Sequence, residues 1–335
     1  MYFPSHAADF RRLLESLRGR PVAVLGHMRP DGDCIGSQVG LTRGLRALGV
    51  DAVAVNHDHT TRLLTDFVGD TPWHLAAEYE PAPGTVAACV DCADHTRLGP
   101  RLRAQFPRPF LAVDHHASNN SFAEHNFVFP DSAATAEVLA GLFFDAGLTP
   151  DSVAAQALYV GIATDTGQFR FPSTTPQVFQ LCSALIAAGA NPGAAAHLLY
   201  ERESYAKLRL LQVFLASLQR EFAGRVCVGF LHDADFASTG ALREDTEGIV
   251  DYARAMDGVD VGVLLEERKG TLKGSLRAKD ERFALHRLAQ RFQGGGHACA
   301  AGFNLPESVA AFYPRFLAAL AEHLRAADAG TAKNP

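Results

Sequence analysis

Apolar runs that predict β-strands alternate with segments of helical spacing along the first half of the chain. The apolar runs cover Val22–Leu25, Asp51–Val55, Thr85–Val90 and Phe110–Val113. Segments with the spacing of helices lie before, between and after them, at Phe10–Leu17, Cys34–Leu48, Ser132–Ala146, Asp151–Ala163 and Thr175–Gly189. Strands that alternate with helices predict an α/β fold with a parallel sheet.

A second set of elements follows the turn signal Asn191-Pro192-Gly193. It begins with a long helical stretch over Glu203–Phe222, and the strand pattern resumes at Val226. Further strands are expected over Val259–Leu265 and Thr271–Ala278, and helices over Glu247–Met256, Phe283–Phe292 and Ser308–Ala326. We therefore expect a first domain over 1–190, a helical linker over 191–223, a smaller α/β domain over 224–328 and a disordered tail over 329–335.

The loop between the first predicted strand and its helix carries His27, Asp31 and Asp33. One imidazole and two carboxylates so close together cannot all be buried without partners, and a shared divalent metal ion would satisfy them. The alternative is a polar turn in which Asp31 or Asp33 caps the helix that follows. Taken alone, this loop favours neither interpretation.

Three more acidic or histidine sites also follow apolar segments. Asp91 ends the run Thr85–Val90, Asp114-His115-His116 ends Phe110–Val113, and Asp165 follows the helical segment Ala154–Thr164. Each could be a solvated strand end or a polar turn, but ligands bind at the carboxyl ends of parallel strands. Four such coincidences favour a metal site. Carboxylates with few histidines suit Mn²⁺ or Mg²⁺, and two such ions can together activate water and clamp a phosphoryl group.

Basic and glycine-rich residues mark the second domain. Ser275 and Arg277 lie two residues apart on a predicted strand, so they face the same way. The run Gly294-Gly295-Gly296-His297 exposes backbone N–H groups that can approach a phosphate. The alternative for the glycines is a helix C-cap with a flexible turn. The other basic side chains between 268 and 291 fit a solvated face of the domain.

The chain resembles the DHH phosphoesterase superfamily in five signatures. They stand here as His27-x-x-x-Asp31-x-Asp33, Asp91, Asp114-His115-His116, Asp165-Thr166-Gly167, and Gly294-Gly295-Gly296-His297 with Ala300-Ala301-Gly302. The last is similar to the signature of the DHH-associated domain. Within the superfamily, the chain resembles the nanoRNase group, which combines oligoribonuclease activity with 3′-phosphoadenosine 5′-phosphate phosphatase activity.

The resemblance implies a role for each residue and an active site in the cleft between the two domains. It implies two divalent ions, Mn²⁺ first and Mg²⁺ as the alternative, with Asp91 bridging them. The implied ligands of one ion are His27, Asp31 and Asp91, and those of the other are Asp33, Asp91, His115 and Asp165. His116 is expected to contact the substrate phosphate, with Asp114 orienting a neighbour. The second domain would hold a terminal phosphate through Arg277, His297 and Ser275, with the loop Gly294, Gly295 and Gly296.

The expected substrates are short single-stranded RNA oligonucleotides, cleaved to mononucleotides, and 3′-phosphoadenosine 5′-phosphate, converted to AMP. Two other hydrolases remain as alternatives: an inorganic pyrophosphatase of family II and a phosphodiesterase of linear dinucleotides of the pApA type. A non-catalytic nucleotide-binding module is a third. The loop Gly294–His297 counts against the pyrophosphatase, and the complete ligand set counts against the binding module.

Composition narrows the class of partner. The chain has 335 residues and a net charge of −6, which argues against an extended nucleic-acid groove because long duplexes select for strongly basic faces. No apolar run approaches the ~20 residues of a membrane span, and Met1–Pro4 has no signal-peptide pattern, so we expect a cytoplasmic protein without a membrane partner; a homodimer is compatible with the sequence. The pair Cys89-x-x-Cys92 has no second pair, which disfavours a zinc or redox site.

Overall fold

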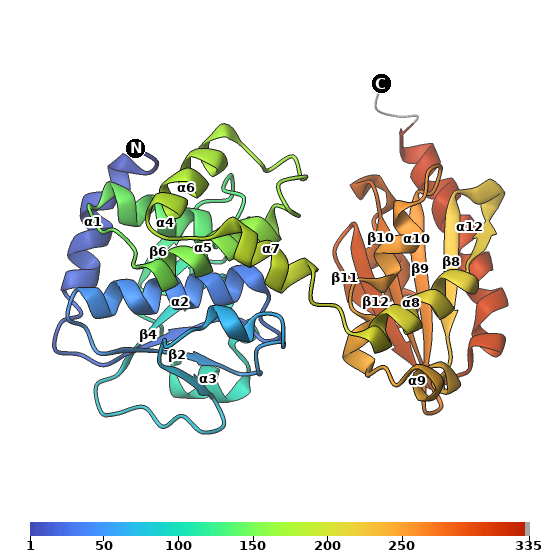
Figure 1. Ribbon diagram of the computed structural model, residues 1–335, viewed down its shortest axis with the longest axis horizontal. Coiled ribbons are helices and arrows are strands. Elements are labelled where there is room, and N and C mark those ends of the chain that lie inside the picture. Colours follow the sequence, from blue (N-terminus) through green and yellow to red (C-terminus); the bar gives the residue numbers. More distant parts are fainter. Residues whose placement is uncertain (332–335) are drawn as a thin grey trace. The chain divides into compact units, whose positions relative to one another are not determined.

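The computed structural model describes residues 1–331, and the chain divides into two compact units after Arg202 (Figure 1). The observed division therefore lies about one helix later in the chain than the boundary at Asn191 that the turn signal predicted. The Asn191 side chain accepts a hydrogen bond from the Ala194 N–H at 2.9 Å and thereby caps helix α7 (Pro192–Tyr200). Since Ala195 and Leu199 of α7 join the core of the first unit, this helix belongs to that unit.

The first unit is built on a six-stranded parallel sheet in the order β3-β2-β1-β4-β5-β6. Its strands are β1 (Val22–Leu25), β2 (Ala52–Asn56), β3 (Trp73–Leu75), β4 (Val86–Val90), β5 (Leu111–Asp114) and β6 (His125–Val128). The predicted parallel sheet is confirmed. The edge strands β3 and β6 were not predicted, because they are short, only partly buried and carry polar residues such as His74 and Asn126.

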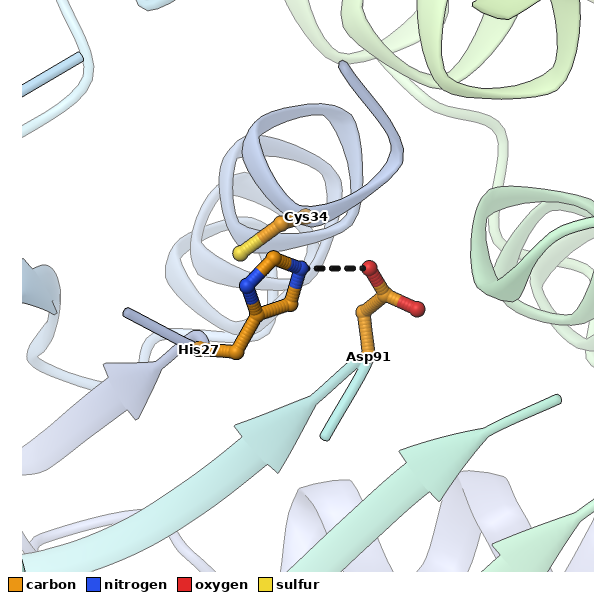
Figure 2. Close-up of side chains that lie close together, drawn as sticks. All are labelled: His27, Cys34 and Asp91. Carbon is orange, nitrogen blue, oxygen red and sulfur yellow. Dashed lines mark ion pairs between the residues drawn. The ribbon is translucent and has the colours of Figure 1, made fainter. Parts of the chain in front are cut away.

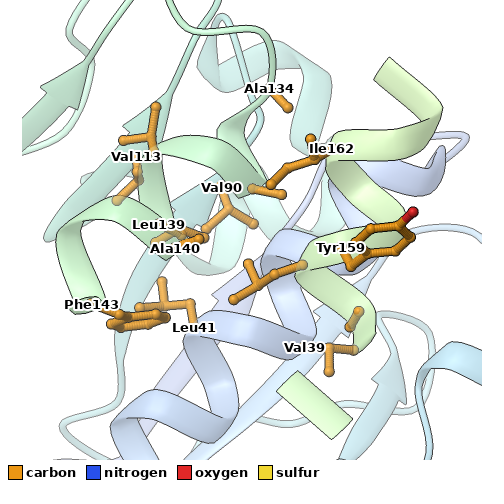
Figure 3. Close-up of a cluster of buried hydrophobic side chains, with 14 of the residues drawn as sticks. Val39, Leu41, Val90, Val113, Ala134, Leu139, Ala140, Phe143, Tyr159 and Ile162 are labelled. Atoms are coloured by element: carbon orange, nitrogen blue, oxygen red, sulfur yellow. The ribbon is translucent and has the colours of Figure 1, made fainter. Parts of the chain in front are cut away.

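Helices cover both faces of this sheet (Figure 1). They are α1 (Pro4–Glu15), α2 (Gly32–Ala47), α3 (Pro100–Gln105), α4 (Thr135–Asp145), α5 (Ser152–Asp165) and α6 (Pro176–Ala187). The larger core lies under α1, α2, α4, α5 and α6, whereas α3 packs against the other face. Figure 3 shows Leu41 of α2, Leu139 and Phe143 of α4 and Ile162 of α5 gathered in the larger core.

Glycines bring α2 and α5 into backbone contact. A Cβ on Gly36 would lie 2.3 Å from the carbonyl oxygen of Ala157, and one on Gly32 would lie 2.3 Å from the Thr164 Oγ1. Only glycine fits such approaches, since real Cβ atoms do not come so close. The start of α2, which carries Asp33, is therefore held against the end of α5, which carries Asp165.

The second unit contains a mixed six-stranded sheet in the order β11-β12-β10-β9-β8-β7. Its elements are α8 (Tyr205–Ala216), β7 (Gln219–Glu221), β8 (Val226–Leu231), α9 (Asp233–Thr239), α10 (Ile249–Ala255), β9 (Val261–Arg268), β10 (Thr271–Ala278), α11 (Leu285–Gln290), β11 (Gly295–Gly296), β12 (Ala300–Leu305) and α12 (Val309–Thr331). Helices α11 and α12 cover one face, and α8, α9 and α10 cover β8 and β9 on the other. The outer face of β10 and β12 stays half-exposed.

Two expectations about the ends of this unit need correction. The stretch expected as a linker helix over Glu203–Phe222 is α8 followed by β7, and α8 is no free arm because it buries Leu210 and Phe214 in the second core. Helix α12 continues through Thr331, past the expected end of the domain at 328. The rest of the expected tail, 332–335, lies outside the described residues.

In the described part of the chain, no helix by itself is long and apolar enough to span a membrane. The pair α6 and α7 meets the length and composition requirement only when the two are joined across their 105° bend.

Candidate metal centre

The strand order places the predicted ligands at one point of the first sheet. Strands β1 and β4 are neighbours although they are not consecutive in the chain, so the order of the sheet reverses between them. Ligands of doubly wound sheets bind at this switch point, beyond the carboxyl ends of the strands. His27 follows β1, Asp91 follows β4 and His115 follows the adjacent β5, so all three project from the same edge.

His27 is buried, and its two ring nitrogens have different partners. Nδ1 donates a hydrogen bond to the Met28 carbonyl oxygen at 2.8 Å, because a carbonyl can only accept. Nε2 faces carboxylates, at 3.3 Å from the Asp91 Oδ2 and 3.8 Å from the Asp31 Oδ2 (Figure 2). Burial lowers the pKa of His27, but its hydrogen bonds and attraction to Asp31 and Asp91 outweigh this and raise the pKa to about 10. A cation, either a proton or a metal ion, is therefore required between these groups.

His115 has the same arrangement as His27, with one ring nitrogen on a backbone carbonyl and the other facing carboxylates. Its Nδ1 donates to the Ser132 carbonyl oxygen at 3.2 Å, and its Nε2 lies 3.3 Å from the Asp165 Oδ2, 3.7 Å from the Asp91 Oδ1 and 3.9 Å from the Asp33 Oδ2. Histidines that bind metals commonly donate their other ring N–H to a backbone carbonyl in this way, which fixes the tautomer.

Asp91 connects the two histidine groups. Its Oδ2 faces His27, whereas its Oδ1 faces His115 and accepts a hydrogen bond from the Thr135 Oγ1 at 3.0 Å. The residue has φ 55°, a left-handed conformation that is unusual for a non-glycine residue. Its N–H donates to the Val113 carbonyl oxygen at 3.1 Å, which ties the end of β4 to β5. Backbone strain of this kind gathers at functional sites.

Asp33, in the first turn of α2, is a buried carboxylate that faces the N-terminus of α4. It accepts hydrogen bonds from the N–H groups of Thr135, at 2.7 Å, and Ala136, at 2.8 Å. Burial and the negative charges of Asp91 and Asp165 raise the pKa of Asp33 well above its ordinary value. Burial also raises the pKa of Asp165, to about 6. Such clustered carboxylates are stable in the charged form only with a nearby cation.

Asp31 confirms the helix-cap alternative and also turns its second carboxylate oxygen towards the histidine cluster. Its Oδ1 accepts a hydrogen bond from the Cys34 N–H at 3.0 Å and so caps α2, while its Oδ2 turns towards His27. Burial opposes the charge of Asp31, but contacts with His27 and the cap hydrogen bond lower the pKa overall.

The residues present fit divalent metal ions. The structure brings all six predicted ligands into one acidic cluster, in which two imidazole Nε2 atoms face carboxylate oxygens; the six are His27, Asp31, Asp33, Asp91, His115 and Asp165. His27, Asp33 and Asp91 are buried, whereas Asp31 lies at the exposed edge of the cluster. Two sets of donor atoms each lie within 4.8 Å of one another: Asp33, His115 and Asp165, and Asp91, His115 and His116. This is the donor chemistry of hard to borderline ions.

His116 and Asp114 form a separate hydrogen-bonded pair beside the cluster. The His116 Nδ1 donates to the Asp114 Oδ1 at 2.8 Å, which raises the pKa of His116. The buried Asp114 also accepts from the Asn119 Nδ2 at 2.7 Å and from the His115 N–H at 2.8 Å. Asp114 therefore orients His116, as expected, and leaves the His116 Nε2 for another partner.

A basic pocket of about 430 Å³ lies in the second unit. Lys273, Ser275 and Arg277 line it from alternate positions of β10. In the described part of the chain neither Lys273 nor Arg277 has an ion pair. By contrast, Arg268 and Arg243 lie 2.8 Å and 2.9 Å from carboxylate oxygens of the buried Glu266. Burial and the charge of Arg268 lower the pKa of Lys273. Glu244 and Glu247 also line the pocket, so its basic character comes from an excess of arginine and lysine over carboxylates. Sequence reasoning had placed Lys273 on a solvated face.

The glycine loop combines a helix end with an edge strand: the Gly294 N–H donates to the Ala289 carbonyl oxygen at the end of α11 at 2.9 Å, as the helix C-cap alternative expects, and Gly295–Gly296 form β11. Gly295 pairs with Gly302, which pairs in turn with Ser275, so these three positions share one face of the sheet. A Cβ on Gly294 or Gly296 would collide with a carbonyl oxygen, at 2.2 Å and 2.4 Å respectively, whereas Gly295 faces open space. Next to it, His297 is exposed, and its ring makes no hydrogen bond within the described chain. The loop therefore offers a bare backbone surface beside Ser275.

Comparison with known proteins assigns both units. The model of the DHH family N-terminal domain matches residues 21–162, and that of the DHHA1 domain matches residues 224–326. A bifunctional oligoribonuclease and PAP phosphatase NrnA from Thermus thermophilus is 31% identical over 314 residues, which cover 93% of this chain and 92% of the relative. The chain belongs to the DHH family.

Other DHH relatives agree over most of the chain. A probable bifunctional oligoribonuclease and PAP phosphatase NrnA from Streptococcus mutans is 27% identical, over 88% of this chain and 93% of the relative. The crystal structure of an exopolyphosphatase-related protein from Bacteroides fragilis has the same fold, with a TM-score of 0.87 and 24% identity over 97% of this chain and 98% of that chain. Family and named relatives identify this DHH protein as a phosphoester hydrolase.

Three polar neighbours of the DHH centre were not predicted from the sequence. Thr135 and Asn119 hold Asp91 and Asp114 through side-chain hydrogen bonds. The Cys34 Sγ, His27 and Asp91 contribute donor atoms within 4.8 Å of one another (Figure 2). Burial raises the pKa of Cys34 well above its ordinary value, so the thiol stays protonated and is a poor ligand for a hard ion. The only sequence signal for Cys34 was its place next to Asp33.

Proposed function

We propose that this DHH protein hydrolyses short RNA oligonucleotides to mononucleotides and 3′-phosphoadenosine 5′-phosphate to AMP, using two divalent ions. The observation that carries the proposal is Asp91, whose two oxygens face separate histidine–carboxylate groups. Mn²⁺ is the preferred ion because the set mixes imidazole with carboxylate, and Mg²⁺ is the alternative. The names of the NrnA relatives support the substrates.

The bound ions would supply an activated water and neutralise charge on the phosphate. His27, Asp31 and Asp91 would hold one ion, and Asp33, Asp91, His115 and Asp165 the other. His116 is suited to donate a proton to the leaving oxygen, because its pKa is raised and its Nε2 has no hydrogen-bond partner among the described residues. Asp114 and Asn119 keep the His116 ring in place for this step.

The basic pocket of the second unit would bind the far phosphate of the substrate. Lys273 and Arg277, which have no ion pair within residues 1–331, supply positive charge, and Ser275 supplies a hydroxyl between them. The bare backbone at Gly295 and the exposed His297 ring would complete the contact. Because this pocket is small and the chain carries a net charge of −6, the proposal is limited to substrates of a few nucleotides.

A time course on end-labelled triribonucleotides tests the proposal. With Mn²⁺ the protein is expected to release mononucleotides from the trimer and AMP from 3′-phosphoadenosine 5′-phosphate, and to leave pyrophosphate intact. Rapid pyrophosphate hydrolysis without RNA cleavage would instead identify a pyrophosphatase. Cleavage of pApA alone, with trinucleotides untouched, would identify a dinucleotide phosphodiesterase.

A further inference from the structure

An exposed aromatic ring stands directly after the metal centre in the chain. The segment that leaves α5 runs Asp165-Thr166-Gly167-Gln168-Phe169-Arg170-Phe171, and Phe171 is 47% exposed. Phe179, at 56%, and Tyr200, at 40%, are further exposed aromatic residues of the same unit. Phe171 stands only six residues after the candidate metal ligand Asp165, so its exposed ring points to a ligand that covers it.

The ring of Phe171 lies on the backbone of Gly167. A Cβ at Gly167 would meet three atoms of this ring, the nearest at 2.4 Å. Gly167 therefore covers one side of the ring. Phe171 is nevertheless 47% exposed to solvent. A ring held flat in this way is a ready surface on which a second planar group can stack.

The loop holds this ring in a fixed position. The Phe171 N–H donates to the Thr166 carbonyl oxygen at 3.0 Å, and the Phe171 carbonyl accepts from the Thr174 N–H at 3.0 Å. Gln168 and Phe169 both have φ 62°, a left-handed conformation that non-glycine residues adopt at an energetic cost. Two such residues in succession, next to a site, indicate a conformation retained for a function.

Arg170 adds a positive charge beside the ring. It is exposed, and its Nε donates to the Gly167 carbonyl oxygen at 2.7 Å. Its remaining N–H groups have no carboxylate partner within the described residues. A guanidinium in this state suits a phosphate. The segment 165–171 thus presents a candidate metal-binding carboxylate, a cation and an open aromatic face within seven residues.

We propose that the loop 166–174 is a nucleotide subsite, in which Phe171 stacks on a nucleobase next to the scissile phosphate and Arg170 contacts a phosphate of the same strand. This inference rests on the proposed function and extends it. Because every base has a π-face, stacking tolerates any sequence, so the subsite selects single-stranded nucleotides without selecting a base.

The test compares Phe171→Leu and Phe171→Trp on intact and abasic dinucleotides. The substrates are pApA and two versions in which one base, at either position, is replaced by hydrogen. Phe171→Leu is expected to lower kcat/KM on intact pApA about 5- to 150-fold, the range for loss of one stacked base. It should cause no further loss on the version that lacks the stacked base, and Phe171→Trp should keep wild-type rates. Tyr205→Ala, which removes a 75% exposed ring from α8, is the matched control and should change nothing.

Three results would overturn the subsite: no loss for Phe171→Leu, equal losses on intact and both abasic substrates, or no rescue by Phe171→Trp. A binding measurement distinguishes failure of the nucleotide subsite from failure of the proposed hydrolase function. Titration with 2-aminopurine riboside 5′-monophosphate reads stacking without turnover, and its fluorescence should be quenched by wild type but not by Phe171→Leu. Absence of this quenching in wild type would also overturn the subsite. Quenching without hydrolysis of pApA would support the subsite and contradict the proposed function.

Discussion

The Asp91 Oδ2 lies 3.3 Å from the His27 Nε2, while the other oxygen of the same carboxylate lies 3.7 Å from the His115 Nε2. One side chain thus serves two histidine groups that come from different strand ends. The left-handed backbone at Asp91 and the hydrogen bond from Thr135 fix its orientation. The chemistry proposed for this DHH protein depends on that orientation.

Chelation is expected to inactivate the enzyme. EDTA should abolish cleavage of a short RNA, and Mn²⁺ should restore it better than Ca²⁺, because Ca²⁺ prefers larger, all-oxygen coordination shells and this cluster includes His27 and His115. The measurement is the initial rate after chelation and after each ion is added back. Full activity after exhaustive chelation would contradict the metal centre.

The fall of kcat/KM at alkaline pH should reflect loss of the proton from His116. A hydrogen bond to Asp114 raises the pKa of His116, so the proton-donating form is present below that pKa and is lost as the pH rises through it. Asp114→Asn removes the negative charge, lowers the pKa of His116 and should move the alkaline limb of kcat/KM to lower pH. An alkaline limb unchanged in Asp114→Asn, with reduced activity throughout, would show that His116 is not the titrating acid.

Arg277→Ala is expected to weaken binding of a terminal phosphate and spare the chemistry. A charge-assisted contact of roughly 1.5–3 kcal/mol corresponds to a loss of about 10- to 150-fold in kcat/KM on phosphorylated oligonucleotides. Bis-p-nitrophenyl phosphate, which is too short to need the basic pocket, should be hydrolysed almost as before. His297→Ala should behave in the same way, whereas Asp33→Ala should lose both activities.

Arg287→Ala is the matched control for Arg277→Ala, because Arg287 is an exposed arginine on α11 that does not line the basic pocket. It should leave both substrates unaffected. Equal losses on both substrates for Arg277→Ala, with folding confirmed by circular dichroism, would mean that the second unit takes part in the chemical step.

The fold was largely predictable where burial dictates the residue pattern. Strands such as β4 and β5 are buried on both faces and therefore appear as apolar runs. The strand order was not predictable, because the pairing of β1 with β4 is a long-range choice that no local pattern encodes. The predicted boundary at Asn191 also failed because it depended on a local pattern. The same turn residues occur at a helix cap and at a domain boundary, and only the packing of α7 into the first core shows that Asn191 is a helix cap.

Packing between α2 and α5 gives a stability prediction. Gly36→Ala should lower the free energy of unfolding of the first unit by about 1–3 kcal/mol, since the added methyl group overpacks the contact with Ala157. The measurement is urea denaturation followed by circular dichroism. Gly193→Ala, whose nearest neighbouring atom to the new Cβ would be 3.4 Å away, is the control and should be neutral or slightly stabilising, as alanine favours helices. A neutral Gly36→Ala would contradict the packing.

The candidate site was predictable where its residues are charged and follow a strand or helix. His27, Asp91 and Asp165 were predicted from such positions, and the structure brings them together. The residues that only orient others, such as Asn119, carry no such signal. Their role depends on a loop that returns to the strand end, as in the 2.7 Å hydrogen bond from the Asn119 Nδ2 to the Asp114 Oδ2.

Asp91→Asn tests the central claim most directly. Asparagine keeps the shape of the side chain and tolerates the left-handed backbone, so the variant should fold, but it removes the charge that both ions would share. The measurement is Mn²⁺-dependent hydrolysis of pApA, trinucleotides and bis-p-nitrophenyl phosphate, with Asp131→Asn, an exposed carboxylate, as the control. We expect Asp91→Asn to lose activity on every substrate and Asp131→Asn to retain it. Appreciable Mn²⁺-dependent turnover by folded Asp91→Asn would contradict a shared bridging carboxylate.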